Sequence, residues 1–188
     1  MHTLAALLLV AAVHGRSEAI VPLHLTVRPD STLRFPNVEG SNLEGRHFSL
    51  PNDLEGDLNI VLVAFRREQQ EDVDTWTPFL TSVTAAHAGV KAYELPTLSR
   101  SYRLVRRFID GGMARGIKVK ATREATITLY IDKEPFKTAL GIATEDLIVT
   151  LLVARDGRVL WRGDGRHSEG AAANLASAIS GAMRSAMP

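Results

Sequence analysis

The chain of 188 residues contains no cysteine. Disulfide bonds, metal sites built on thiolates, thiol-disulfide exchange and peroxide reduction at a cysteine are therefore excluded. Neither sign of charge is in excess, because 22 Lys or Arg residues balance 21 Asp or Glu residues to leave a net charge of +1. This balance gives no reason to expect a nucleic-acid partner or an acidic substrate.

The motifs of common metal, nucleotide and hydrolase sites are missing as well. No P-loop or GxGxxG motif occurs in a suitable context, and no GxSxG elbow surrounds Ser168, which we expect to cap a helix. The histidines after the N-terminal leader show neither HxxxH nor HExxH spacing; they are His24, His47, His87 and His167. We predict no metal and no cofactor.

Residues 1–19 have the pattern of a secretory signal peptide. Leu4 to Val13 is an unbroken apolar run of ten residues, too short to span a bilayer, and small residues follow where a signal peptidase reads. Cleavage is expected after Ala19 or after Gly15, with export to a periplasm or cell envelope. The alternatives are a hydrophobic leader that stays attached and a misassigned start codon.

Residues 20–188 are expected to form one domain, since 45% of the chain is hydrophobic and 23% is charged. The domain is organised around Leu58–Thr84. Its first part, LNIVLVAF, has the length and continuity of a buried strand. A polar loop follows, and then apolar residues recur at helical spacing: Val73, Trp76, Leu80 and Val83. A buried strand that feeds an amphipathic helix is typical of an α/β fold.

Further elements are predicted along the chain. Strands are expected at 23–27, 90–95 (ended by Pro96), 126–131, 147–153 and 159–161, with a tight turn at Asp156-Gly157. Helices are expected at 100–110, where Gly111 and Gly112 stop an apolar stripe of Leu104, Val105, Phe108 and Ile109, at 134–140 from Pro135, and after Ser168 with Leu175, Ile179 and Met183 buried. Residues 113–147 are interpreted as an insertion.

The spacing around the first helix resembles that of thioredoxin-like proteins. In that superfamily an aromatic residue ends the strand, a CxxC motif begins the helix, and a proline five residues after the second cysteine kinks it. Here Phe65 ends the strand and Pro78 lies in the helix, which places Gln70 and Val73 at the two cysteine positions. The buried acid of many thioredoxins is replaced by Ala64.

Two further stretches extend the resemblance. The segment after Phe35, with Gly40, Gly45 and Phe48, is similar to the N-terminal hairpin of the envelope and peroxiredoxin branches, where Gly45 would supply a positive φ. Counting back from Gly157 places Ile148 where redox members carry a cis-proline. The resemblance implies an α/β, thioredoxin-like fold: a mixed central sheet with flanking helices, an N-terminal hairpin extension and an insertion before the last β-hairpin.

The motifs DVDTW, TPF, LGI, LLVARDGRVLWRGDG and HSEG resemble the mitochondrial ATP synthase assembly factor family and its bacterial relatives, over roughly Phe35 to Met183. That resemblance implies a protein partner, a membrane-protein segment in particular.

The candidate binding site is the loop at the degenerate CxxC position. It lies at the carboxyl end of a central strand, where α/β sheets place ligands, and at a helix start that favours an anion. Glu68 and Glu71 already supply negative charge there, so a contact surface is favoured over a small-anion pocket. The residues assigned to this site are Arg66, Arg67, Gln69, Gln70, Asp72 and Val73.

A wider contact surface is predicted from Ile148, Trp161 and Arg162, although Trp76 and Trp161 also suit the core. From Arg100 to Arg123 eight Lys or Arg residues face one Asp, among them Arg103, Arg106 and Arg107. This basic stretch is either a solvated face or a peripheral contact with anionic lipid or an acidic partner.

Two classes of function remain open. The first is a redox-inactive thioredoxin-like binding or assembly module of the envelope, which needs no catalytic group. The alternative is an enzyme of a non-thiol type that uses the loop from Arg66 to Asp72. The first is preferred, because no catalytic constellation is found in the sequence.

Overall fold

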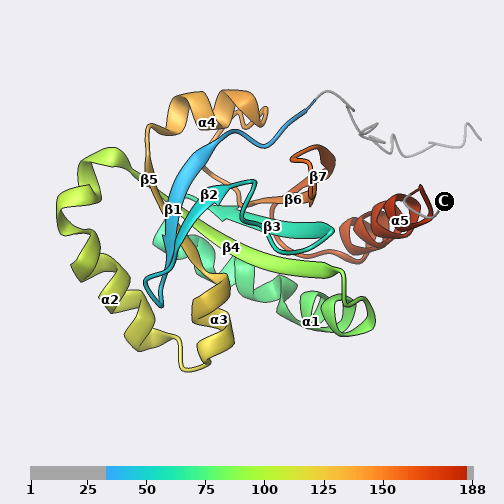
Figure 1. The fold of residues 1–188 in the computed structure, drawn as a ribbon, viewed down its shortest axis with the longest axis horizontal. Helices are drawn as coiled ribbons and strands as arrows, with labels where there is room; N and C mark the ends of the chain where they lie inside the picture. The colour runs from blue at the N-terminus through green and yellow to red at the C-terminus, as the bar shows by residue number, and fades with distance from the viewer. Residues whose placement is uncertain (1–32, 186–188) are drawn as a thin grey trace, which may run out of the picture.

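A computed structural model describes residues 33–185 of the chain. These residues build one seven-stranded sheet in the order β2-β1-β5-β4-β3-β6-β7 (Figure 1). The strands are β1 (Val38–Asn42), β2 (His47–Leu50), β3 (Leu58–Ala64), β4 (Val90–Ser99), β5 (Ile127–Ile131), β6 (Val149–Ala154) and β7 (Val159–Asp164). The helices are η1 (Arg67–Gln69), α1 (Gln70–Ala86), η2 (Arg100–Val105), α2 (Arg106–Gly116), α3 (Lys120–Ala125), α4 (Lys133–Ala139) and α5 (Glu169–Ser185).

Four neighbouring strands form the mixed sheet that the thioredoxin-like prediction requires. β3 pairs in parallel with β4 and antiparallel with β6, and β7 returns antiparallel to β6. β5 adds a further strand parallel to β4, and the antiparallel hairpin β1–β2 attaches to β5. The hairpin therefore extends the sheet through the inserted strand.

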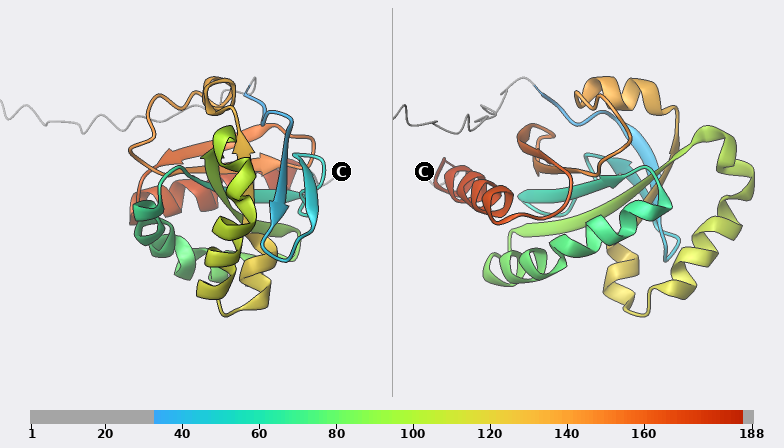
Figure 2. Two further views of the ribbon diagram at one scale, coloured as in Figure 1. Left: turned by 90° about the vertical axis from the view of Figure 1, so that its left-hand side faces the viewer. Right: turned by 180° about the vertical axis from the view of Figure 1, so that it is seen from behind.

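The sheet separates two cores because successive side chains of a strand point to opposite faces. On one face Ile60 and Leu62 pack with Trp76 of α1 and with Leu175 of α5. On the other face Val61 packs with residues of the hairpin and of α4, including Phe48, Leu50, Phe136 and Leu140. Every residue of β3 is buried, including Asn59, whose side-chain amide donates to the carbonyl of Gly56 at 3.0 Å and accepts from the Gly56 N–H at 2.9 Å. Figure 2 shows α1 and α5 on one side of the strands and α4 on the opposite side.

The turns and caps follow the predicted chemistry. Gly45 and Gly157 have φ of +87° and +83°, the region that glycine adopts without steric cost. The backbone N–H of Ala171 donates to Ser168 Oγ at 3.2 Å, so Ser168 caps α5 as expected. Pro78 lies inside α1, which packs beside the parallel strands β3 and β4.

The second parallel strand does not end at Pro96, as predicted, but continues to Ser99. The ladder with β3 finishes at the pair Ala64 and Pro96, and the ladder with β5 begins at Thr97. Pro96 thus lies at the change of partner, where its missing N–H removes little of either ladder.

The predicted helix at 100–110 is also wrong in its type, its end and its buried face. Residues 100–105 form a 3₁₀ helix, and α2 continues through Gly111 and Gly112 to Gly116. Leu104 and Phe108 were expected in the core, but their exposed fractions are 97% and 80%. Helical periodicity locates a stripe and leaves open whether another element covers it.

Smaller differences concern the insertion and the last strands. α4 begins at Lys133 behind the cap Asp132, which accepts from Glu134 N–H at 3.3 Å, and Pro135 lies in its first turn. α3 was not predicted. β6 begins two residues later than expected, and β7 extends to Asp164. The predicted strand at 23–27 and the leader at 1–19 lie outside the described residues.

Candidate functional site

The loop at the degenerate CxxC position is fixed by one buried glutamine. Gln69 Oε1 accepts from the backbone N–H of Phe65 at 2.7 Å and of Arg66 at 3.2 Å. Its Nε2 donates to the carbonyl of Glu145 at 2.8 Å, which ties the end of β3 to the segment before β6. Gln69 was predicted as a contact residue, but it is only 5% exposed, so its amide serves the loop itself.

Apolar side chains fill the positions that thiol chemistry would use. Val73 is 6% exposed and Ile148 is fully buried, and both belong to the core between α1, α5 and the sheet. Gln70 is exposed at the first turn of α1 and donates from Nε2 to Asp74 Oδ1 at 3.0 Å. The structure thus places Val73 and Ile148 in the same buried apolar cluster.

Two charged residues of this loop form ion pairs with neighbouring loops. Arg66 forms an ion pair with Asp146 at 2.8 Å, and Asp72 pairs with Arg166 from the loop after β7 at 3.3 Å. An anion at Arg66 would therefore have to displace a carboxylate. Arg67 is exposed and has no carboxylate partner within residues 33–185. Of the predicted site residues, Arg67 and Gln70 are the ones best placed to meet a partner.

Trp161 and Arg162 lie on opposite sides of β7. The ring of Trp161 is half-buried and packs edge-on against Trp76 at 6.5 Å between centroids. Arg162 pairs with Asp164 at 2.9 Å and donates to the carbonyl of Gly141, which fixes the end of α4. Both side chains are therefore engaged in packing or in holding neighbouring segments.

An ionic cluster that no local sequence pattern indicates lies beside the loop. Glu145 contacts Lys133 and Lys137, and Lys137 also pairs with Glu134 at 2.7 Å. Partial burial would raise the pKa of the Glu145 carboxyl, but hydrogen bonds from both lysines outweigh it and lower that pKa. The hydrogen bond to Glu134, aided by Glu145, raises the pKa of Lys137. This cluster could not be predicted from a local sequence pattern, because Lys133 and Glu145 are twelve residues apart.

A second candidate site lies at the same edge of the sheet, beyond the carboxyl ends of β4 and β5. It is a pocket of about 420 Å³ between the β1–β2 hairpin, β5 and η2. Arg103 and Arg106, both predicted as contact residues, line it together with Arg100. In a 3₁₀ helix side chains three residues apart align, so Arg100 and Arg103 of η2 lie in one row, and Arg106 at the start of α2 lines the same pocket. Their i, i+3 spacing is the signal that could have identified Arg100.

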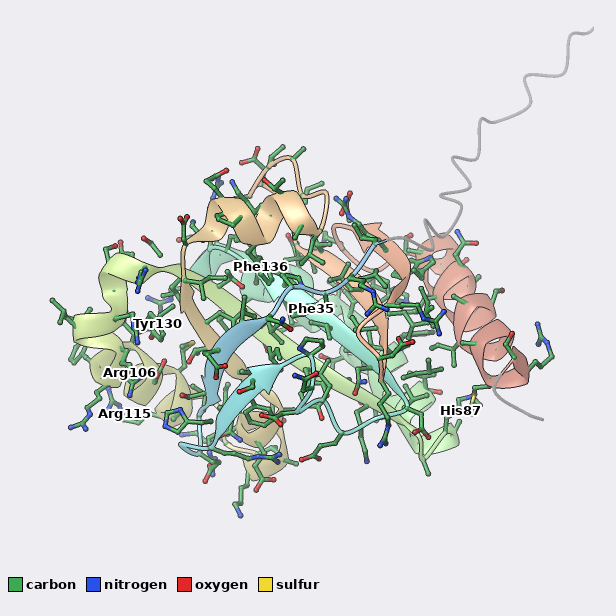
Figure 3. The ribbon with its side chains drawn as sticks, turned by 45° about the horizontal axis from the view of Figure 1, so that its top comes forward. Phe35, His87, Arg106, Arg115, Tyr130 and Phe136 are labelled. Atoms are coloured by element: carbon green, nitrogen blue, oxygen red, sulfur yellow. The ribbon has the colours of Figure 1, made fainter. Side chains whose placement is uncertain are left out.

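Most other polar groups of this pocket already have partners. Tyr130 donates its hydroxyl to Asp110 Oδ1 at 2.8 Å, and burial, followed by that hydrogen bond, raises the pKa of Tyr130. His47 Nδ1 lies 3.1 Å from Ser41 Oγ. Figure 3 shows Arg106 on α2 with Tyr130 close by. Arg107 is exposed outside the pocket lining.

Within residues 33–185 no group of three or more His, Asp or Glu side chains is arranged to hold a metal ion. Among the helices of the same residues, none combines the length and the apolar character needed to cross a bilayer.

Comparison with solved structures identifies the fold. BsSco, a member of the Sco family of cytochrome c oxidase assembly proteins, matches with a TM-score of 0.53 at 13% identity, over 80% of this chain and 94% of its own. Yeast Sco1 with copper bound matches with 0.51 at 12%, over 83% and 96%. Etrx1, the exposed lipoprotein thioredoxin of Streptococcus pneumoniae, matches with 0.50 at 13%, over 77% and 99%. The chain therefore has a thioredoxin-like fold, as predicted.

Comparisons of sequence add no family. No protein-family model matches the chain, and no curated protein matches it. The resemblance to the ATP synthase assembly factor family is not shown by these comparisons.

Proposed function

We propose that this chain is a redox-inactive binding module of the cell envelope, which holds a protein segment and assists the assembly of a membrane-protein subunit. One observation carries the proposal: within a thioredoxin-like fold, Val73 and Ile148, which the sequence spacing assigns to the second cysteine and the cis-proline, are buried in one apolar core. A binding role requires the fold and the loop at the carboxyl end of β3, but it does not require a thiol.

The contact surface is the loop from Arg66 to Asp72. It lies at the carboxyl end of β3, where α/β sheets present ligand-binding loops. Gln69 and the ion pairs of Arg66 and Asp72 hold its backbone, while Arg67 and Gln70 remain exposed. A fixed loop with exposed polar tips loses little conformational freedom on binding, which favours affinity.

The envelope location and the assembly role rest on indirect support. The apolar run Leu4 to Val13 has the length of a signal-peptide core. Among the structural neighbours, BsSco belongs to a family of cytochrome c oxidase assembly proteins, and Etrx1 is an exposed lipoprotein. The copper of yeast Sco1 is not carried over, since this chain lacks cysteine and a metal-binding group among its described residues.

The test is affinity capture from envelope extracts. The full chain, the charge-reversal variants R67E and R66E/R67E, and the control R184E are compared. Arg184 is an exposed arginine in the last turn of α5, distant in sequence from the loop. Circular dichroism checks that each variant is folded, because R66E also disturbs the pair with Asp146.

We expect one protein to be captured by the full chain and by R184E, and its recovery to fall about tenfold or more with R67E. Equal capture by R67E and R184E would contradict the contact surface. Turnover of a small molecule by the purified chain, with no captured protein, would favour the alternative of a non-thiol enzyme.

A further inference from the structure

Four of the six exposed large hydrophobic residues within residues 33–185 lie on η2 and the start of α2. Tyr102, Leu104, Val105 and Phe108 have exposed fractions of 50%, 97%, 51% and 80%. We call these four residues, with Arg100, Arg103, Arg106 and Arg107, the η2–α2 ridge. Tyr102 and Val105 are three residues apart in the 3₁₀ helix η2 and therefore align, and Phe108 follows in the first turn of α2. Exposed apolar patches of this kind on a soluble fold mark interaction sites.

The ridge is also the centre of a strong charge asymmetry. The stretch from Arg100 to Arg123 has eight Lys or Arg residues and one Asp, which leaves fourteen basic and twenty acidic residues in the rest of the chain. Within residues 33–185 the four ridge arginines have no carboxylate partner. Asp110, the one acid, accepts the hydroxyl of Tyr130. A positive ridge on an otherwise negative molecule is oriented by an anionic surface.

The side of α2 that packs on the rest of the molecule is formed by residues other than the apolar residues of the ridge. Tyr130 of β5 holds α2 through Asp110, and Ile109 and Met113 are among the half-buried residues of the helix. Leu104 and Phe108 are exposed instead. The helix α2 that carries Phe108 lies at an outer side of the molecule (Figures 1 and 2). A protruding helix with apolar tips and flanking arginines has the features of an interfacial membrane helix.

We propose that the η2–α2 ridge docks on a membrane surface that contains anionic phospholipids. Leu104 and Phe108 enter the boundary between headgroups and acyl chains. The ridge arginines contact lipid phosphates, for which the planar guanidinium is suited. A lipid surface is favoured over a protein partner because Leu104 and Phe108 are 97% and 80% exposed and are flanked by arginines that pair with no carboxylate within residues 33–185. This proposal does not depend on the loop from Arg66 to Asp72.

The absence of cysteine gives a direct test, because one introduced cysteine is a unique site for a label. The full-length variants F108C and L147C are labelled with an environment-sensitive fluorophore. Leu147 is the matched control, since it is a large apolar residue with an exposed fraction of 51% in the loop before β6. The probes are vesicles of phosphatidylcholine alone and of phosphatidylcholine with 30% phosphatidylglycerol.

With the anionic vesicles we expect a blue shift and increased emission at position 108 and no change at position 147. In co-sedimentation, L104S/F108S should bind these vesicles at least tenfold more weakly and L147S as well as the unchanged chain. R103E/R106E should weaken binding by more than tenfold, since each basic residue near the surface contributes roughly fivefold. Phosphatidylcholine alone should bind weakly.

Three results would overturn the proposal. The first is an unchanged signal at position 108 with anionic vesicles, and the second is an equal shift at positions 108 and 147. The third is a protein from envelope extracts that protects position 108 when vesicles do not, which would assign the ridge to a protein partner. Circular dichroism of L104S/F108S excludes misfolding, and both exposed sites tolerate polar side chains.

Discussion

Two buried threonines differ in whether their hydroxyl group has a hydrogen-bond partner. Thr150 of β6 and Thr128 of β5 are both buried, with exposed fractions of 0% and 2%. Thr128 donates to the carbonyl of Ser41 at 3.1 Å, whereas Thr150 Oγ1 has no hydrogen-bond partner among residues 33–185. The two threonines therefore allow opposite predictions for one substitution.

Thr150→Val should stabilise the protein by about 1 kcal/mol, because it removes an unpaired buried hydroxyl at nearly constant volume. Thr128→Val should destabilise it by about 1 kcal/mol, because the carbonyl of Ser41 loses its donor. Denaturant unfolding monitored by tryptophan fluorescence measures both. A stability loss with Thr150→Val would show that its hydroxyl is paired.

Glu145 should make stability depend on pH. Its lowered pKa means that the folded state favours the carboxylate, so the stabilisation is present above the ordinary value of about 4.5 and is lost as the pH falls through the folded value. E145Q should be less stable than the unchanged chain at pH 7, and the difference should shrink below pH of about 4.5. Thermal unfolding from pH 7 to 3 measures it.

Glu94 should give stability the opposite dependence on pH and therefore serves as a control. Burial, aided by the nearby carboxylate of Asp74, raises its pKa, so the folded state gains stability from this group as the pH falls. E94Q should therefore be most stabilising at neutral pH. Parallel pH profiles for E145Q and E94Q would contradict both assignments.

At the scale of elements, the sequence predicted those features that depend on a local requirement for one type of residue. The mostly apolar sequence of β3, the positive φ of Gly45 and Gly157 and the cap at Ser168 are local requirements, and each is met. Gly111 and Gly112 were expected to stop a helix, yet they lie within α2. Their φ angles are not positive, so an α-helix accepts them at a modest entropic cost.

The burial of elements and sites could not be predicted in this way. The stripe of Leu104 and Phe108 has helical spacing, but only the fold determines that no described element covers it. The candidate loop was located by counting from Pro78, yet the roles of Gln69 and Glu145 depend on a contact across 76 residues. The continuation of β4 beyond Pro96 could not be predicted either, because the sequence does not reveal that the strand changes its pairing partner there.

The glycines of α2 give a prediction for this element. Gly112 is exposed and an added Cβ would meet no described atom within 4 Å, so Gly112→Ala should stabilise the protein by about 0.5–1 kcal/mol. At Gly157 the same change should cost more than about 1 kcal/mol, because φ is +83° and the new Cβ would lie 2.9 Å from Pro51 Cγ. Denaturant midpoints compare the two variants.

Gln69 gives a prediction for the junction between elements. Gln69→Ala should destabilise the protein by about 2–4 kcal/mol, since it leaves the N–H groups of Phe65 and Arg66 and the carbonyl of Glu145 without this partner. Gln70→Ala, at an exposed neighbouring position, should change stability by less than about 0.5 kcal/mol. Equal effects of the two changes would contradict the role assigned to Gln69.

At the scale of the whole molecule, one face of the sheet is covered by α1 and α5 and the other by the hairpin and α4. The free edge is formed by the carboxyl ends of β3, β4 and β5, where the loop from Arg66 to Asp72 and the η2–α2 ridge both lie. We propose that this edge performs both tasks of the molecule: the loop holds a protein segment and the ridge holds the membrane surface. A thioredoxin-like fold then contributes shape and position, and no sulfur chemistry.

The most direct test of a binding function is photo-crosslinking in intact cells, with a benzophenone amino acid in place of Arg67 and, as the control, in place of Arg184. Both positions are exposed, so the label is tolerated at either. We predict that position 67 yields one discrete crosslinked protein in the envelope fraction and that position 184 does not. Identical patterns at the two positions, or no crosslinked protein at position 67, would contradict the proposed binding function.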